Sequence, residues 1–537
     1  MPEIVSTQLI VGLEVHVELS TRSKMFAPVA SLAHPSGYDA PPNTLIDPVV
    51  LALPGALPVM NRAAVELSAM VGLALGCRVA PRSVWDRKSY FYPDLPKNYQ
   101  ISQFQLPLCT QGVLELPPIT AQGKIDYEAL AGGAASDSAP GTRIRIIRAH
   151  LEEDAGKLMH EAPAEWGGLA VAGSIADYNR AGTPLLEIVT EPDFTSADQV
   201  VVFCQVLRNI CRFLGASEGV MQRGHIRFEP NINCRLGLAD GRSVDTPVVE
   251  IKNLNSFRSV KGAIEHELRE QPRRWLADGL ERRPGSKTTR GWDDQAGVTF
   301  LQREKEEAHD YRYFPDPDLV PVEIDAEWLA RIAARVTELP LDRCKRYART
   351  LGLPARDAAT LTEERDVCLF FESTLAAAVA QGVDADRAGR LVANALLQSG
   401  AKRANERTTM DRQALVSDLG ITPAQVAGII SLRDSGRLNS TSADDLFGAL
   451  CDGGGQDPGA DPERVAAARG WLIVRDDGAL DTWCDKVIAG NAKAADDVRA
   501  GKLQALGRLV GETMKLAGGA ADAKSVRETL LKKLGQG

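Results

Sequence analysis

The sequence lacks long apolar runs and paired cysteines. No stretch of about 18 apolar residues occurs in the 537 residues, so no membrane span is predicted. Residues 1–7 lack the basic and apolar regions of a secretory signal. The nine cysteines are scattered without a CxxC pair and are odd in number. This usage favours buried free thiols in a reducing cytoplasm over a disulfide framework or a thiolate zinc site.

The composition is that of an ordinary globular protein. Apolar residues make up 44% and charged residues 25% of the chain, so disorder is not expected. At roughly 100–200 residues per domain, the length predicts two to four domains. The net charge of -9 argues mildly against nonspecific binding of nucleic acid. It leaves room for a local basic surface that binds phosphates.

The first part of the chain, to about residue 293, mixes strands with helices. Apolar and polar residues alternate over 11–19, which predicts a strand with one polar face. The segment 143–152 is a second predicted strand. Ser196 and Gln199 have the spacing of a capping box before an apolar helix.

From about residue 326 the pattern becomes helical. Thr422 and Pro423 are typical of an N-cap followed by proline at the first helical position. A packed helix is predicted from apolar residues at helical spacing, which are Cys368, Leu369, Phe371, Leu375 and Val379. The pattern of apolar and basic residues over 501–537 predicts short amphipathic helices.

The sequence therefore predicts an α+β protein with three domains, 1–293, 294–409 and 410–537. The first is a large mixed domain, the second a helical connector and the third a small helical tail. The tail carries basic residues that include Lys502, Arg508 and Lys515. Basic helix surfaces of this kind are typical of solvated faces as well as of nucleic-acid contacts.

Metal-binding residue types recur on the predicted strands. Glu14 and His16 are two apart and therefore point to one face, and His150 and Glu152 repeat that spacing. Further carboxylates follow at Glu153, Asp154, Glu187 and Glu191. If these segments meet, they would bind magnesium, or equally manganese. Solvated strand faces have the same spacing, which does not show that the segments meet.

Lys88 lies just before the aromatic run 90–92, where it could bind a phosphoryl group as a point charge or lie along a domain surface.

Two segments resemble known catalytic motifs in their letters but lack a required feature. The segment 215–219 has the letters of a nucleophile elbow, but a predicted helix precedes it where a strand is required. The segment 285–288 would need a glycine where Leu280 stands, so any ATP is not held by a P-loop.

Several long strings together resemble one family. They are 11–16 (VGLEVH), 90–97 (YFYPDLPK), 99–103 (YQISQ), 150–157 (HLEEDAGK), 177–180 (DYNR), 182–193 (GTPLLEIVTEPD), 250–257 (EIKNLNSF) and 310–315 (DYRYFP). In this order they resemble the B subunit of the tRNA-dependent amidotransferase (GatB family). The tail strings 509–511 (LVG) and 514–515 (MK) are similar to the YqeY-like tail of that family.

The resemblance implies a cradle domain that holds metal, ATP and the acyl-tRNA end, a helical domain and a tRNA-binding tail. It also implies a ligase that forms a carbon–nitrogen bond with glutamine as amido donor. Such an enzyme activates Glu-tRNA(Gln), Asp-tRNA(Asn) or both with ATP and Mg²⁺, and ammonia then displaces phosphate. Because the protein does little covalent chemistry, positioning and charge neutralisation dominate.

Residue roles and partners also follow from the resemblance. The metal pocket is matched by Glu14, His16, Glu152, Glu153, Glu187 and Glu229, the phosphate-side lysine by Lys88, and catalytic roles by Lys88, Glu152 and His150. Contacts of the tail with tRNA are assigned to Lys502, Arg508 and Lys515. Because the sequence contains no recognisable glutaminase, ammonia is expected from an amidase A subunit, held in a heterotrimer by a small C subunit.

Three departures from the family pattern stand out. Ala27, Val29, Asp47 and Val50 replace a cysteine cluster found in many members, so no structural zinc is expected. The family string MxEGxLRxDxN reads MQRGHIRFEPN over 221–231, with Arg223 for a glutamate and Glu229 for an aspartate. The tail reads GKLQALGR over 501–508, where the family has Gly-Lys-x-Lys-Ala-x-Gly-Phe. Arg223 and Glu229 motivate a rival hypothesis, a noncatalytic tRNA-binding scaffold.

Overall fold

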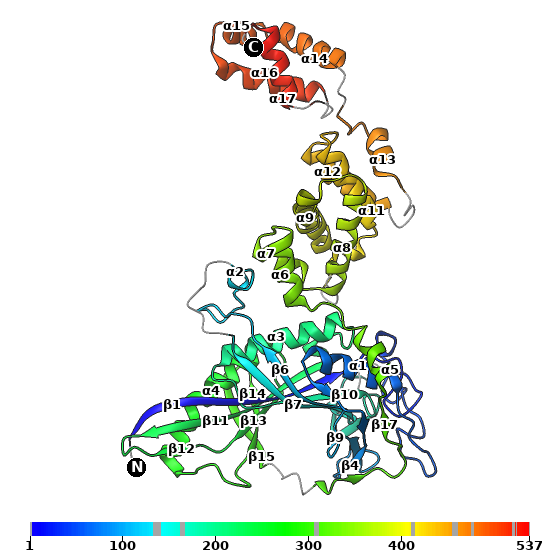
Figure 1. Cartoon of the computed structure of the whole chain (residues 1–537), viewed down its shortest axis with the longest axis vertical. Helices are drawn as coiled ribbons and strands as arrows, with labels where there is room; N and C mark the ends of the chain where they lie inside the picture. Colours follow the sequence, from blue (N-terminus) through cyan, green and yellow to red (C-terminus); the bar gives the residue numbers. More distant parts are fainter. Residues whose placement is uncertain are drawn as a thin grey trace. The chain divides into compact units, whose positions relative to one another are not determined.

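The computed structural model describes residues 3–132, 141–161, 167–304, 311–409, 414–453, 460–473, 477–517, 521 and 523–535. Its contacts divide the chain into two compact units, 1–342 and 343–537 (Figure 1). The first unit is built around β-sheets and the second is helical, as an α+β chain requires.

A ten-stranded sheet forms the centre of the first unit, in the order β15-β14-β13-β11-β1-β10-β7-β6-β2, with β12 paired to β11 (Figure 1). Its strands are β1 (Ile4–Glu18), β2 (Arg78–Val79), β6 (Cys109–Glu115), β7 (Arg143–Glu153), β10 (Pro184–Thr190), β11 (Ile226–Leu238), β12 (Ser243–Asp245), β13 (Val249–Lys252), β14 (Thr288–Asp293) and β15 (Val298–Glu304). The strands predicted over 11–19 and 143–152 are confirmed, and β1 begins seven residues earlier than expected, at Ile4 instead of residue 11.

The two faces of this sheet differ because side chains alternate along each strand. On β1, Val15 and Val17 are fully buried, whereas Glu14 and His16 point to the opposite face. The apolar face is covered by α1 (Arg62–Ala74), α3 (Ala197–Phe213) and α4 (Phe257–Asp278), which share one hydrophobic core with the strands (Figure 1). The polar face therefore carries the side chains that can bind a ligand.

The start of α3 agrees in part with the capping box predicted from Ser196 and Gln199. The Ser196 hydroxyl accepts a hydrogen bond from the Gln199 backbone N–H at 3.2 Å, as predicted. The Gln199 side-chain oxygen accepts from the backbone N–H of Thr195, at 2.9 Å, instead of from that of Ser196. The return bond is thus shifted by one residue, from Ser196 to Thr195.

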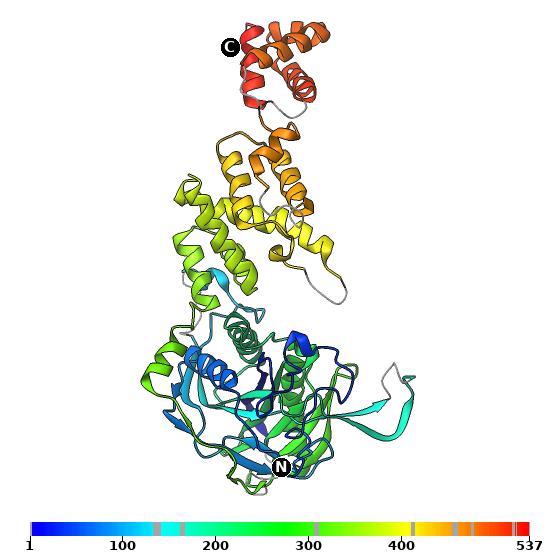
Figure 2. The ribbon, with the colours of Figure 1, turned by 90° about the vertical axis from the view of Figure 1, so that its right-hand side faces the viewer.

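Shorter elements surround the large sheet. A three-stranded sheet contains β16 (Phe314–Pro315), β4 (Asp86–Ser89) and β5 (Tyr99–Ser102), and two pairs are β17 (Val322–Glu323) with β3 (Arg82–Ser83) and β8 (Lys157–Glu161) with β9 (Ala170–Asp177). Figure 2 shows β8 and β9 as a ribbon that extends from the side of this unit. Helices α2 (Tyr127–Leu130) and α5 (Ala326–Ala333) complete it. Strand β4 positions Lys88 beside the polar face.

The second unit consists of helices, the first of which, α6, begins at the end of the first unit. They are α6 (Pro340–Thr350), α7 (Ala355–Leu361), α8 (Arg365–Ala380), α9 (Ala385–Asn394), α10 (Ala401–Arg407), α11 (Pro423–Asp434), α12 (Ser440–Gly453), α13 (Pro462–Ala468), α14 (Asp477–Gly490), α15 (Ala492–Arg499), α16 (Leu506–Leu516) and α17 (Ala523–Lys533). Thr422 caps α11 with Pro423 in the first turn, as predicted. Helices α14 to α17 have a hydrophobic cluster of their own.

One helical prediction needs correction. Cys368 and Phe371 of α8 are fully buried, as expected. Leu369 and Val379, which the helical spacing also places on the packed face, are 39% and 42% exposed. Apolar residues occur on more than one side of this alanine-rich helix, so its spacing alone overestimates the buried face.

The cysteines have the state that the sequence predicts. All nine are free and buried. Burial raises the pKa of the Cys77 thiol to about 11, which keeps it protonated and unreactive at neutral pH. In the ranges that the structure describes, none of the helices has the length and apolar content to cross a membrane.

Candidate active site

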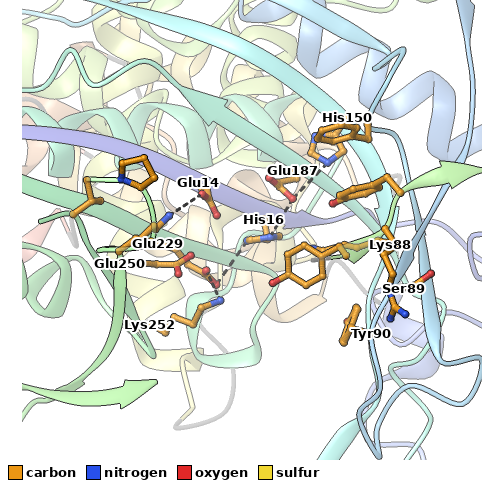
Figure 3. A pocket seen from close by; sticks show the side chains of 18 of the residues that line it. Glu14, His16, Lys88, Ser89, Tyr90, His150, Glu187, Glu229, Glu250 and Lys252 are labelled. Carbon is orange, nitrogen blue, oxygen red and sulfur yellow. Dashed lines mark ion pairs between the residues drawn. The ribbon is translucent and has the colours of Figure 1, made fainter. Parts of the chain in front are cut away.

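Strand register brings the predicted polar residues together on the open face of the large sheet (Figure 3). His16 on β1 lies directly opposite Glu187 on β10, and Glu187 lies opposite His150 on β7. On the other side of β1, Glu14 pairs with Glu229 of β11. Directly paired residues of antiparallel strands share a face, so these five side chains converge.

These side chains line a pocket of about 1690 Å³. Its wall continues from the large sheet to β4 and the segment 311–313 on one side, and to the loop 282–287 on the other. The labelled residues of Figure 3 are Glu14, His16, Lys88, Ser89, Tyr90, His150, Glu187, Glu229, Glu250 and Lys252. The pocket therefore contains both carboxylates and cations.

The two histidines have opposite charge preferences. The Nε2 atom of His16 lies 3.7 Å from carboxylate oxygens of both Glu152 and Glu187, and its Nδ1 lies 3.8 Å from Glu229. Burial alone would lower the pKa of His16, but these carboxylates raise it to about 9. His150 lies 3.5 Å from Glu187, yet burial lowers its pKa to about 4. In the metal-free protein His16 is cationic and His150 neutral at pH 7.

The pKa values of the carboxylates Glu152 and Glu187 are also shifted in opposite directions. Burial, followed by the charge of Glu187, raises the pKa of Glu152 to about 7. Burial also acts to raise the pKa of Glu187, but His150 and His16 hold it well below its usual range. The Oε2 atom of Glu152 is buried without a hydrogen-bond partner among the described residues. A buried acceptor of this kind suits a cation or a proton.

Two groups have the ligand atoms for a hard divalent cation. In each group the candidate atoms all lie within 4.8 Å of one another. The first group contains His16, Glu152 and Glu187, and the second contains Glu14, Glu229 and Glu250. Carboxylate oxygens with a single imidazole are ligands that Mg²⁺ and Mn²⁺ accept. The residues present therefore fit a divalent cation.

Two residues of this site were not assigned from the sequence. Glu250 belongs to the second ligand group, and Lys252 places its Nζ 2.8 Å from Glu229. Both lie on the short strand β13, two residues apart and hence on one face. The string 250–257 carried part of the family resemblance, and this was the signal that could have identified them.

Lys88 projects into the pocket from β4 (Figure 3). Its Nζ lies 5.1 Å from the centre of the Tyr311 ring. Burial acts to lower its pKa, but Glu152 and Tyr313 raise it well above the usual value. Lys88 is therefore a permanent cation beside the acidic groups, and it suits a phosphoryl oxygen.

Glu153 is not brought to either ligand group. Its neighbour Glu152 faces the pocket, and consecutive residues of a strand point to opposite faces. Glu153 instead forms an ion pair with Lys97, and its carboxylate accepts a hydrogen bond from the Ile101 backbone N–H at 3.0 Å. The structure thus places it in a buried contact between β7 and β5.

A second buried network extends from the polar face. Arg227 donates to Glu18 at 3.2 Å and to Asp154 at 3.0 Å, while Arg180 lies 3.7 Å from Asp154. Burial raises the pKa of Glu18 to about 8. Burial would also raise that of Asp154, but the two arginines lower it to about 2. Asp154 therefore holds the negative charge of this network at pH 7.

The two unusual residues of 221–231 lie in different places. Glu229 lines the pocket and belongs to the second ligand group. Arg223, at the end of a short 3-10 turn (Met221–Arg223), lies over the ring of Tyr38 at 4.7 Å, and that ring stacks on His225. Arg223 is not one of the described residues that line the pocket. Its charge reversal therefore falls outside the site.

The basic residues predicted for the tail lie at the surface of the second unit. Lys502, Arg508 and Lys515 are exposed, and Lys502 forms an ion pair with Asp497 at 3.0 Å. Arg508 and Lys515 are seven residues apart on α16, about two helical turns, so they point to the same side.

Comparison with known proteins gives one consistent result. Residues 9–330 match the family described as the GatB/GatE catalytic domain, and residues 375–534 match the GatB domain. The chain is 42% identical to the B subunit of the aspartyl/glutamyl-tRNA(Asn/Gln) amidotransferase of Thermomicrobium roseum, over 98% of this chain and 99% of the relative. B subunits of the same name are 39% identical in Rhodopirellula baltica (97% and 96% covered) and 40% identical in Burkholderia pseudomallei (98% and 99% covered).

Proposed function

The chain belongs to the family of aspartyl/glutamyl-tRNA(Asn/Gln) amidotransferase B subunits, and on this premise we propose that it carries out the ATP-dependent activation and amidation of Glu-tRNA(Gln), Asp-tRNA(Asn) or both. It acts as the ligase subunit of a complex that uses glutamine as amido donor. The observation that carries this proposal is the pocket in which Lys88 faces two groups of carboxylates.

The reaction has two steps. The side-chain carboxylate of the misacylated tRNA is a poor acyl donor, because its leaving group would be oxide. A carboxylate oxygen therefore attacks the γ-phosphorus of ATP and ADP leaves, which gives an acyl phosphate. Ammonia then attacks the acyl carbon, phosphate leaves and the amide forms with loss of a proton. Positioning and charge neutralisation are the main contributions that a protein can make to such a transfer.

The residues of the pocket have distinct roles in this proposal. His16, Glu152 and Glu187 would hold one Mg²⁺, and Glu14, Glu229 and Glu250 a second. Bound Mg²⁺ neutralises negative charge on phosphoryl oxygens. Lys88, a permanent cation beside Glu152, binds the transferred phosphoryl group.

His150 and Glu152 complete the catalytic set. His150 is neutral at pH 7 and lies 3.5 Å from Glu187, so it positions that carboxylate without adding charge. Glu152 directs one carboxylate oxygen to His16, and its other oxygen is buried with no partner among the described residues. This second oxygen is available to the bound cation or to the proton that ammonia loses.

The proposal includes partner subunits and a location. Ammonia comes from an amidase A subunit, because the sequence has no recognisable glutaminase, and a small C subunit completes a heterotrimer in the cytoplasm. The tail holds the tRNA through Lys502, Arg508 and Lys515. No structural zinc is expected, because Ala27 and Val50, two of the residues that replace the cysteines of many members, pack with Ala181 in a small apolar cluster.

The scaffold hypothesis receives no support from the pocket. It rested on Arg223 and Glu229. Arg223 packs on Tyr38 away from the pocket lining, and Glu229 keeps a carboxylate within the second ligand group. The catalytic proposal is therefore the one that the arrangement favours.

An amidation assay tests the proposed function. The chain is assembled with its A and C partners and given Glu-tRNA(Gln) or Asp-tRNA(Asn) with ATP, Mg²⁺ and glutamine. We expect the amidated tRNA from at least one substrate, and no product without ATP. An assembled complex that binds tRNA but makes no product would establish the scaffold hypothesis instead.

A further inference from the structure

The loop 282–287, which leads into β14, forms a basic edge of the pocket. Arg282 and Arg283 are exposed and line the pocket together with Lys287. The Nζ of Lys287 lies 3.8 Å from a carboxylate oxygen of Glu14. The loop thus connects the outer edge of the pocket to the second ligand group.

This loop is fixed by hydrogen bonds. The Arg283 backbone N–H donates to the Ser286 hydroxyl at 3.0 Å, and that hydroxyl donates back to the Arg283 carbonyl at 2.7 Å. The Arg282 backbone N–H donates to the Asp245 carbonyl at 2.8 Å, and Thr288 is tied to Val248 at 3.1 Å. A positively charged loop with a fixed backbone can hold a ligand at a defined place with little ordering cost.

An aromatic wall, formed by Phe91, Tyr92, Phe104 and Tyr313, faces the loop across the two ligand groups of the pocket. Phe91 and Tyr92 are 72% and 56% exposed at the pocket edge, and Phe104 stacks on Tyr313 with ring centres 4.3 Å apart. These aromatics belong to the β4 and β5 side, next to β7, whereas the loop belongs to β14. Five strand spacings separate β14 from β7, which corresponds to roughly 24 Å.

The charge distribution favours a polyanion at this edge. The whole chain has a net charge of -9, yet the pocket edge has three cations within six residues, at 282, 283 and 287. The carboxylates of the two ligand groups lie on the strands of the sheet and are less exposed than Arg282 and Arg283. A basic edge that faces exposed aromatic rings across a pocket suits single-stranded nucleic acid, since phosphates pair with cations and bases stack on rings.

We propose that the loop 282–287 binds the phosphodiester backbone of the unpaired acceptor end of the tRNA, while Phe91 and Tyr92 on the facing wall stack on its bases. This inference rests on the proposed function, because it assigns a binding surface to the tRNA of that reaction. The loop and the two aromatic residues, which together we call the clamp, hold the RNA strand at both edges of the pocket. The aminoacyl group of the tRNA then reaches the ligand groups that lie between these edges.

Phosphate could also come from ATP. The arrangement favours the tRNA, because the two arginines are exposed at the edge and Lys88 already stands beside the acidic groups on the opposite side. The two sources differ in a measurable way. Loss of a contact to tRNA lowers the affinity for tRNA and makes that affinity less dependent on salt concentration. Loss of a contact to ATP raises the KM for ATP.

The test is the double variant Arg282→Gln/Arg283→Gln in the assembled heterotrimer. Binding of fluorescently labelled tRNA(Gln) and tRNA(Asn) is measured at several salt concentrations without turnover. We expect about tenfold weaker binding of the recognised tRNA, and a slope of log K against log salt that is smaller by about 1.4, since each single-strand phosphate contributes about 0.7. The KM for ATP should stay unchanged.

Arg242→Gln/Arg273→Gln is the matched control, because it removes two exposed arginines outside the pocket lining. Equal effects in both double variants would overturn the proposal, as would a raised KM for ATP with normal tRNA binding.

A second variant, Phe91→Leu/Tyr92→Leu, tests the facing wall. It should weaken binding of intact tRNA and leave unchanged the binding of a tRNA that lacks its unpaired terminal nucleotides. Equal weakening of both tRNAs would overturn the stacking assignment. These binding measurements do not depend on turnover, so a failed amidation assay and a failed clamp are distinguishable.

Discussion

Among single residues, Glu187 lies at the centre of the site. It lies opposite His16 on one neighbouring strand and His150 on the other. Its carboxylate is the group that both imidazoles approach, at 3.7 and 3.5 Å. A change at Glu187 therefore disturbs the first ligand group, the charge of His16 and the environment of His150 together.

We expect Glu187→Gln to lower kcat for amidation by at least about 100-fold, because the loss of a direct metal ligand exceeds the roughly 10–100-fold effect of outer contacts. Its tRNA affinity should stay within about twofold of the wild-type value. Amidation and tRNA binding by the assembled complex measure the two effects. Glu115→Gln, an exposed carboxylate on β6, is the control, and equal kcat in both variants would remove Glu187 from the site.

Glu153 separates the sequence-based assignment from the observed contact. If its role is the ion pair with Lys97, Glu153→Gln should reduce the free energy of unfolding by about 3 kcal/mol, because a buried partner is left uncompensated. Mg²⁺ affinity, measured by calorimetry on the complex, should not change. A large loss of Mg²⁺ affinity at unchanged stability would restore Glu153 as a ligand.

The sequence identified the residues of the first ligand group and Lys88, but it also assigned Glu153 to the metal pocket. Alternation along a strand puts Glu152 on the face of His150 and Glu153 on the opposite face, so Glu153 followed from the resemblance and not from the spacing. Only the pairing of β7 with β10 shows that the face of His150 and Glu152 is the one that meets Glu187. Glu250 was missed because no periodic pattern marks a strand of four residues.

Among the secondary-structure elements, the strands of the large sheet assemble the site, and the helices of the second unit pack through buried apolar residues. The strand predicted over 143–152 and the cap at Thr422 followed from local spacing. The order β11-β1-β10-β7, which joins four sequence segments into one face, did not, because it depends on contacts between residues far apart in the chain.

One ion pair between α10 and α12 gives an acid-sensitive contact. Arg403 donates to the Asp444 carboxylate at 2.8 Å, and Ser399 donates to it at 2.6 Å. These hydrogen bonds hold the pKa of Asp444 well below its usual range. Since the folded pKa is depressed, the stabilisation is present above the unfolded pKa of about 4 and is lost as pH falls further.

Asp444→Asn should therefore destabilise the chain at pH 7 by about 1 kcal/mol, a small value because the carboxylate is one-third exposed. The difference from wild type should shrink below about pH 4. Urea unfolding at several pH values measures it, with Asp366→Asn, an exposed acid on α8, as control. A difference that is constant with pH would contradict the assignment.

For the molecule as a whole, the proposed function divides the work between the two units. The pocket lies in the first unit, and the exposed cations of α16 lie in the second. Binding of the tRNA body and chemistry at its end should therefore respond to different substitutions.

Arg508→Gln/Lys515→Gln tests this division. Loss of two phosphate contacts should weaken tRNA binding about tenfold and leave kcat at saturating tRNA unchanged. Amidation rates over a range of tRNA concentrations give both values. Lys486→Gln/Lys493→Gln, at two further exposed lysines of the tail, is the control, and an unchanged KM for tRNA relative to it would show that α16 does not bind tRNA.

The central claim is that the carboxylate of the misacylated tRNA is phosphorylated by ATP in this pocket. It is tested most directly with Glu-tRNA(Gln) or Asp-tRNA(Asn) whose side-chain carboxylate carries a heavy isotope at both oxygens. The assembled complex amidates this substrate, and the released inorganic phosphate is analysed by mass spectrometry. We predict one labelled oxygen in each phosphate released with product. Phosphate without label, in a reaction that still consumes ATP and forms the amide, would contradict an acyl phosphate.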